Sequence, residues 1–93
     1  MKHYIIVKFN EKTEKEKIIN PIRELFQKAI KIKEVEKVEI YESNTDLPNR
    51  YDLMIKMDLS KNALKEFDNS EIHKEWKEKF GKYITSKTIF DCE

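Results

Sequence analysis

The feature that most constrains the fold of this chain is a strict two-residue alternation between residues 51 and 59. The alternating rows are Tyr51, Leu53, Ile55, Met57 and Leu59 on one side, and Asp52, Met54, Lys56 and Asp58 on the other. Successive side chains of a strand point to opposite faces of a sheet. The pattern therefore predicts a central strand whose first row packs in a core.

The same period predicts three further strands. Residues 3–9 place one row, His3, Ile5, Val7 and Phe9, opposite a second, Tyr4, Ile6 and Lys8. Residues 35–42 alternate with Val38 and Ile40 on one side and polar residues on the other, which is typical of a strand with one wet face. Residues 84–92 are rich in Thr and Ile, which favours a last strand.

A first helix is predicted between the first two strands. Its apolar residues recur at steps of three and four: Ile18, Ile22, Leu25, Phe26, Ala29 and Ile30. Thr13 and Glu16 have the spacing of a capping box, so we expect the helix to begin there. Pro21 leaves two alternatives open: either it kinks the helix, or a new helical segment begins with Asn20 as its cap.

A second helical region is predicted after Ser60. Its apolar positions fall into two groups: Ala63, Leu64 and Phe67, followed by Ile72, Trp76 and Phe80. A pause at residues 68–70 separates them and is expected to carry a new helix cap. Gly81 suits the end of this region.

The order of elements is strand, helix, strand, strand, helix, strand, which predicts an α+β, ferredoxin-like βαββαβ fold as a single domain over residues 1–93. Right-handed crossovers place both helices on one face of the antiparallel sheet. The other face then exposes Tyr4, Ile6 and Met54 among Lys8 and Lys56. We expect a homodimer to cover this open sheet face.

Composition excludes several classes of function. Charged residues make up 40% of the chain, but the net charge is only +1, and residues 51–59 lack the pattern of RNA-binding sheets, so we expect no nucleic-acid partner. A single glycine rules out glycine-rich phosphate loops. His3, His73 and Cys92 do not form a zinc-binding pattern, and we expect neither metal nor cofactor. No apolar run is long enough to span a membrane, and no signal peptide is evident, so a cytoplasmic protein is expected.

Several segments together resemble the stress-responsive A/B barrel (Dabb) family. They are residues 2–9, residues 51–55, residues 63–76 and the closing Ile89-Phe90-Asp91, so the resemblance covers nearly the whole chain. It implies ferredoxin-like subunits that join sheet to sheet as a dimeric α/β barrel. Most members have no assigned biochemical role, and some are associated with stress.

One plant branch of this family cyclises linear polyketides without a cofactor. The resemblance to that branch implies catalytic roles for His73, for Asp91, which would orient His73, and for His3. The tyrosine of that branch is replaced by Phe67, which removes the hydroxyl that would polarise the substrate carbonyl.

The residues themselves support part of this assignment. Antiparallel pairing of the first and last strands brings His3 near Asp91. His73 shares the inward stripe of its helix with Trp76, and an imidazole held by a carboxylate in an apolar pocket has a raised pKa and can serve as a general base. Phe67, Trp76 and Ile5 are the candidate lining of a ligand pocket, although aromatic residues at helical spacing more commonly pack in a core.

Two functions are therefore expected as alternatives. The first is a small homodimer with a cavity between helices and sheet for an apolar small molecule, and the family resemblance implies a stress-related role for it. The second is a cofactor-independent enzyme, similar to polyketide cyclases or antibiotic-biosynthesis monooxygenases, in which His73 removes a proton. The replacement at Phe67 favours the first.

Overall fold

The computed structural model describes residues 1–60 and 62–93. Its elements follow the predicted order. They are β1 (Lys2–Phe9), α1 (Lys15–Gln27), η1 (Lys28–Lys31), β2 (Val35–Glu42), β3 (Leu53–Leu59), α2 (Ala63–Asp68), α3 (Glu71–Glu75), η2 (Trp76–Phe80), η3 (Gly81–Tyr83) and β4 (Ile84–Cys92).

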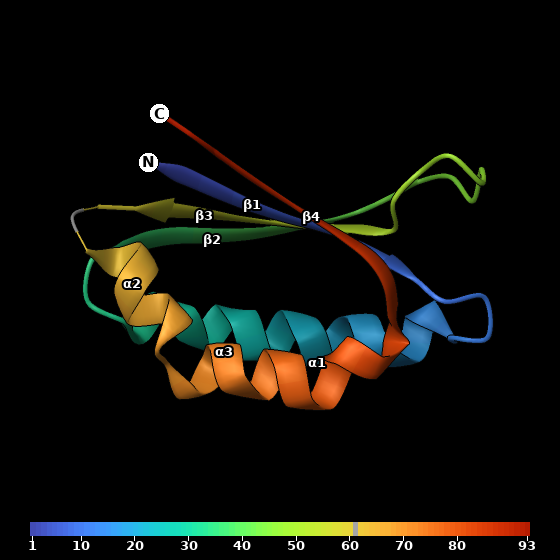
Figure 1. The fold of residues 1–93 in the computed structure, drawn as a ribbon, viewed down its shortest axis with the longest axis horizontal. Coiled ribbons are helices and arrows are strands. Elements are labelled where there is room, and N and C mark those ends of the chain that lie inside the picture. Colours follow the sequence, from blue (N-terminus) through green and yellow to red (C-terminus); the bar gives the residue numbers. More distant parts are fainter. Residues whose placement is uncertain (61) are drawn as a thin grey trace.

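The strands form one antiparallel sheet in the order β2-β3-β1-β4, with α1, α2 and α3 together on one face (Figure 1). This confirms the α+β, ferredoxin-like fold and the central place of the third strand. The register between β1 and β4 pairs His3 with Asp91 and Ile5 with Ile89. The start of β1 therefore lies beside the end of β4, at the left in Figure 1.

The helix-covered face of the sheet carries the core. Alternate residues of β1 and β3 are buried there and pack against α1: Ile5, Val7, Phe9, Leu53, Ile55, Met57 and Leu59 meet Ile19, Ile22, Leu25 and Phe26. The opposite face, here called the open face, keeps Tyr4, Ile6 and Met54 only partly buried. The two-residue alternation thus divides the apolar content between a core and a second apolar surface, as predicted.

The start of α1 differs from the prediction. The N-cap is Glu14, and no side chain caps the helix. The Thr13 hydroxyl instead donates a 2.6 Å hydrogen bond to the Asn10 side chain, which holds the turn before the helix. The predicted capping box is therefore wrong, because the Thr13 side chain already has a local partner.

Pro21 lies inside α1, which continues without a break to Gln27. The alternative in which a new segment begins at Asn20 is therefore wrong. The missing N–H of Pro21 weakens one turn, but Ile19, Ile22 and Phe26 on either side of it are buried against the sheet. Tertiary packing outweighs the local cost of proline.

The second helical region is interrupted where the sequence indicates. Ser70 caps α3 by accepting a hydrogen bond from the His73 backbone N–H at 3.2 Å. Gly81 is the C-cap of η2, so this helix ends where the sequence indicates. Gly81 keeps a right-handed helical conformation, however, and the short 3-10 helix η3 follows before β4 begins.

The predicted alternation does not hold for the two residues that precede β3. Tyr51 precedes the strand and is exposed, and its hydroxyl lies 2.8 Å from the Thr88 hydroxyl. Asp52 is buried instead. The predicted placement of Tyr51 in the core row and Asp52 in the opposite row is therefore wrong.

In the part of the chain that the structure describes, no helix has both the length and the apolar character that crossing a membrane requires.

Candidate functional site

All the site residues predicted from the sequence line one pocket, which we call the histidine pocket. It has a volume of about 500 Å³ and lies between the helices and the β1–β4 end of the sheet. It contains the predicted catalytic residues His3, His73 and Asp91 and the predicted lining residues Ile5, Phe67 and Trp76. The remaining lining residues are Leu64, Asp68, Lys77, Lys87 and Ile89. Residues distant in the sequence converge because the start of β1, the end of β4 and the α2–α3 connection meet here.

The base of the histidine pocket holds a cross-strand pair. Nδ1 of His3 shares a short hydrogen bond with a carboxylate oxygen of Asp91. His3 is only 6% exposed, whereas the Asp91 side chain is 42% exposed. The carboxylate fixes the ring orientation and makes Nδ1 the bonded nitrogen, so that Nε2 is the one left for a ligand.

His73 stands on the helix side of the same pocket. The Ser70 cap fixes its backbone, and its ring packs edge-on against Phe67 at 5.3 Å between centroids. Burial lowers the pKa of His73, and Lys77 and Lys87 lower it further, while Asp68 acts in the opposite direction. The imidazole is therefore neutral at neutral pH.

The predicted orientation of His73 by Asp91 is not found. Asp91 bonds His3, and within residues 1–60 and 62–93 no hydrogen bond joins Asp91 to His73. The expected rise in the pKa of His73 is also wrong, because the group lacks that carboxylate and is partly withdrawn from water.

The aromatic wall of the histidine pocket belongs to the core as well. Phe67 is fully buried and Trp76 is 2% exposed. Both pack on Phe26 of α1, Trp76 edge-on at 4.9 Å and Phe67 at 5.9 Å between ring centroids. These side chains therefore hold the shape of the pocket while lining it.

Two lysines of the pocket escaped the prediction. Lys77 lies one helical turn after His73, and Lys87 lies two and four residues before Ile89 and Asp91 on the same strand face. The helical and strand periods that located the other residues could have found both. They balance the charges of Asp68 and Asp91 around the pocket.

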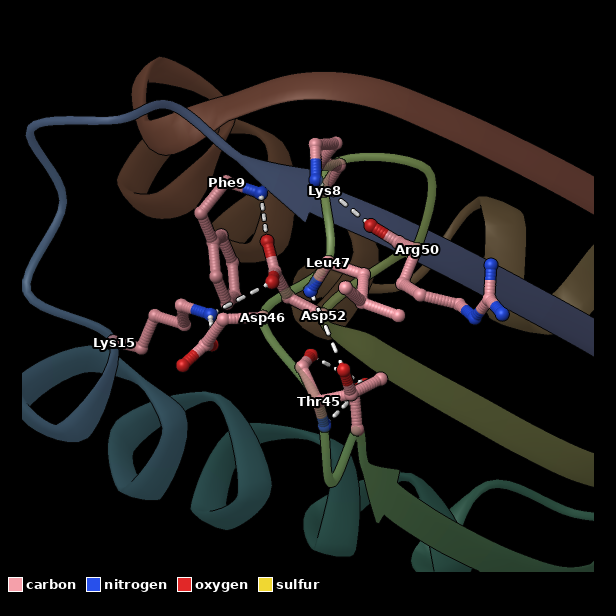
Figure 2. Close-up of polar contacts among 9 residues, drawn as sticks. Lys8, Phe9, Lys15, Thr45, Asp46, Leu47, Arg50 and Asp52 are labelled. Carbon is pink, nitrogen blue, oxygen red and sulfur yellow. Dashed lines mark hydrogen bonds and ion pairs between the residues drawn. The ribbon is translucent and has the colours of Figure 1, made fainter.

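A second polar cluster, also missed, lies at the opposite end of β1 (Figure 2). The buried Asp52 carboxylate accepts 2.8 Å and 2.9 Å hydrogen bonds from the Phe9 backbone N–H and from Nζ of Lys15. Lys15 also donates to Asp46 at 2.6 Å. These hydrogen bonds, to Asp46 first and Asp52 second, raise the pKa of Lys15, and the Lys15 ammonium lowers the pKa of Asp46. The cluster ties the loop before β3 to the start of α1.

Among the described residues, no three His, Cys, Asp or Glu side chains gather as metal ligands would. The histidine pocket contains two imidazoles, one of them fixed by a carboxylate. They can accept or donate protons beside an apolar wall.

The family model of the Stress Responsive A/B Barrel Domain (Dabb) matches residues 1–93. No curated protein sequence matches the chain.

Solved structures share the fold at low sequence identity. A dimeric ferredoxin-like protein of unknown function from Thermobifida fusca has a TM-score of 0.80 at 11% identity, over 96% of this chain and 85% of that one. Hydroxynitrile lyase from Passiflora edulis has a TM-score of 0.75 at 12% identity, over 96% and 87%. A putative antibiotic biosynthesis monooxygenase from Nitrosomonas europaea has a TM-score of 0.69 at 13% identity, over 99% and 98%.

Proposed function

Because this chain belongs to the stress responsive A/B barrel domain family, we propose that it is a homodimer whose histidine pocket binds a small molecule with an apolar body. One observation carries the binding proposal: His3, Asp91 and His73 converge with an aromatic wall in one pocket of about 500 Å³. Ligand sites are typically concave and largely apolar, with a few polar groups that set orientation. We include a stress-related role and a cytoplasmic location in the same proposal. The family's description supports the stress-related role.

Trp76, the single tryptophan of the chain, offers a direct test of binding. We expect 4-phenylbutan-2-one, a neutral ketone with an apolar body, to shift the indole N–H resonance of Trp76 in a saturable manner. His3→Gln should weaken this binding, whereas the exposed Lys74→Gln on α3 should leave it unchanged. An indole resonance that stays fixed up to the solubility limit of the ketone would contradict the binding proposal.

The open face supports the homodimer. Its exposed aromatic side chains, Tyr41, Tyr51 and Phe90, surround Ile6 and Met54 across all four strands. Contiguous apolar surface of this kind marks an interaction site. The Thermobifida fusca neighbour with the same fold is dimeric, which supports a second copy of this chain as the partner.

Sedimentation tests the homodimer. The wild-type protein should sediment as a dimer at micromolar concentration, and a variant carrying Ile6→Glu and Phe90→Glu should sediment as a monomer. Ile30→Glu is the matched control, because Ile30 is 48% exposed on η1, away from the open face. A monomeric wild type would show that the open face is not a dimer interface.

A second candidate function, cofactor-independent proton transfer, is favoured by the neutral state of His73. A neutral imidazole beside an apolar wall can take a proton from the carbon next to a carbonyl group, which leaves an enolate, and can return it. Hydroxynitrile lyase and the putative monooxygenase, named above as neighbours, support an enzymatic use of this fold. In this version His73 is the general base, and Asp91 acts on the adjacent His3.

Deuterium exchange distinguishes the two candidates. If His73 is a base, the protein should accelerate exchange at the carbons beside the carbonyl of 4-phenylbutan-2-one in D₂O, and His73→Asn should abolish the acceleration. Phe67→Tyr, which adds a hydroxyl beside the His73 ring, should increase it. Binding without exchange would leave the ligand-binding function and eliminate the enzymatic one.

A further inference from the structure

A second and larger pocket, here called the lysine pocket, lies at the other end of the β1–β4 pair. Its volume is about 840 Å³, within the range of about 300–1,000 Å³ that small-molecule sites occupy. The end of β1 and the following loop form one wall, and the first turns of α1 form the second. The third wall is η3 and the start of β4, at the right in Figure 1. It shares no lining residue with the histidine pocket.

Hydrogen bonds between these segments hold the walls in place. The Asn10 backbone N–H donates to the Tyr83 carbonyl at 2.8 Å, and the Asn10 side chain donates to the Lys82 carbonyl at 3.2 Å. Thr13 bonds the same Asn10 side chain at 2.6 Å. Asp52 accepts hydrogen bonds from the Phe9 backbone N–H and from Lys15 in the first turn of α1, which joins these two segments (Figure 2). The pocket is therefore formed before any ligand enters.

The floor of the lysine pocket is apolar. Phe9 is buried in the core, and Ile18 and Tyr83 are partly buried against it. An apolar hollow that remains open to water favours a ligand with an apolar body, because binding removes that surface from water.

The rim of this pocket carries excess positive charge. It has Lys8, Lys12, Lys17 and Lys82 against Glu11 and Glu14. Lys17 pairs with Glu14 at 2.8 Å, and Lys8 donates to the Arg50 carbonyl at 2.7 Å. Lys12 and Lys82 form no ion pair with any described residue, and Nζ of Lys82 lies 5.2 Å from the centre of the Tyr83 ring. Two unpaired ammonium groups therefore stand above the apolar floor.

We propose that the lysine pocket is a binding site for a small amphipathic anion, a carboxylate joined to an aryl or alkyl body of a few carbons. The body packs on Phe9, Ile18 and Tyr83, and the carboxylate lies between Lys12 and Lys82. The charge-balanced lining of the histidine pocket gives no such preference for anions. The site is independent of the function proposed for the histidine pocket.

Titration of ¹⁵N-labelled protein with 4-phenylbutyrate tests this site, with 4-phenylbutan-1-ol as the matched neutral probe. The anion should shift the amide resonances of Asn10, Thr13 and Tyr83 and leave His3 and His73 in place. The alcohol should bind at least about tenfold more weakly, which corresponds to about 1.4 kcal/mol. Added salt should weaken the binding of 4-phenylbutyrate but leave the binding of 4-phenylbutan-1-ol unchanged.

Matched double variants complete the experiment. Lys12→Gln with Lys82→Gln should weaken 4-phenylbutyrate binding about tenfold, whereas Lys77→Gln with Lys87→Gln, in the histidine pocket, should not change it. The dispersion of the amide spectrum shows that each variant remains folded. The proposal is overturned if the anion and the alcohol bind equally, if the shifts fall on the histidine pocket instead, or if millimolar 4-phenylbutyrate causes no shift.

Discussion

The histidine pocket and the lysine pocket lie at opposite ends of the same strand pair, but different kinds of contact secure them. The wall of the histidine pocket includes α2 and α3, helices of six and five residues, and is held by the Ser70 cap and the His3–Asp91 pair. The lysine pocket rests on the thirteen-residue α1 and on one buried carboxylate, Asp52. The two ends are therefore stabilised by separate sets of contacts, and we expect a substitution to affect one end at a time.

Asp52→Ala should have the largest effect. It leaves the buried Phe9 N–H without its acceptor and the Lys15 ammonium with Asp46 alone, and an unsatisfied buried donor costs about 1–3 kcal/mol. We expect the free energy of unfolding to fall by about 2 kcal/mol, a decrease in Tm of roughly 8–16 °C for a domain of this size. Thermal denaturation followed by circular dichroism measures it.

Asp46→Ala is the control for this prediction. Asp46 binds the same Lys15, but its side chain is 90% exposed, so its loss should change stability little. In Asp52→Ala, the amide shifts should centre on residues 8–15, and the Trp76 indole resonance should stay in place. Equal losses of stability in the two variants would show that Asp52 does not stabilise the lysine-pocket end of the sheet.

The helix starts should give the next largest difference. Ser70→Ala removes the N-cap of α3, which typically costs about 1 kcal/mol. Thr13→Ala removes only the bond to Asn10 and no helix cap, so about 0.5 kcal/mol is expected. Urea denaturation measures the free energy of unfolding of the two variants. If Thr13→Ala lowers it as much as Ser70→Ala does, the result would support Thr13 as a helix cap, as the sequence suggests.

These substitutions mark where sequence reasoning succeeds and where it stops. Period-two rows and their order were enough to predict the sheet, its covered face and the approach of His3 to Asp91. The register of a strand is set by its whole hydrophobic row, so one irregular residue does not change it. Asp52 and Thr13 could not be placed this way. Each lies at the end of an element, where one side-chain hydrogen bond decides the conformation, and its partner is set by the tertiary fold.

The partner of Asp91 illustrates the same limit within the site. The β1–β4 register fixes His3 opposite Asp91 and can be predicted from topology. Whether the carboxylate bonds His3 or His73 depends on how α3 sits over the sheet, and no local pattern encodes that. The choice decides which imidazole is fixed by a carboxylate and which is merely desolvated, and therefore the direction of the His73 pKa shift.

A smaller, pH-dependent effect is expected at the histidine pocket. Burial lowers the pKa of His73 from its ordinary value of 6.5, so below pH 6.5 the unfolded chain binds a proton before the folded one does. His73 therefore makes the free energy of unfolding fall as the pH drops through 6.5 towards the folded pKa, and this loss is absent above that range.

Urea midpoints at pH 7.5 and pH 5 measure this contribution. His73→Asn should reduce the difference between the two midpoints, and the neighbouring Lys74→Gln should keep it as in the wild type. A ring resonance of His73 that titrates at or above 6.5 would contradict the assignment.

The smallest stability effect is expected at the lysine rim. Lys12 and Lys82 form no ion pair with described residues, so replacing both with Gln should change the free energy of unfolding by less than about 0.5 kcal/mol. Lys15→Gln, three residues beyond Lys12, should cost clearly more, because Lys15 neutralises the buried Asp52. Thermal denaturation of both variants provides the comparison. If the rim variant loses as much stability as Lys15→Gln, the rim lysines are part of the fold. If the rim variant loses no stability while its binding of 4-phenylbutyrate falls about tenfold, the charges of Lys12 and Lys82 contribute to ligand binding and not to the stability of the fold.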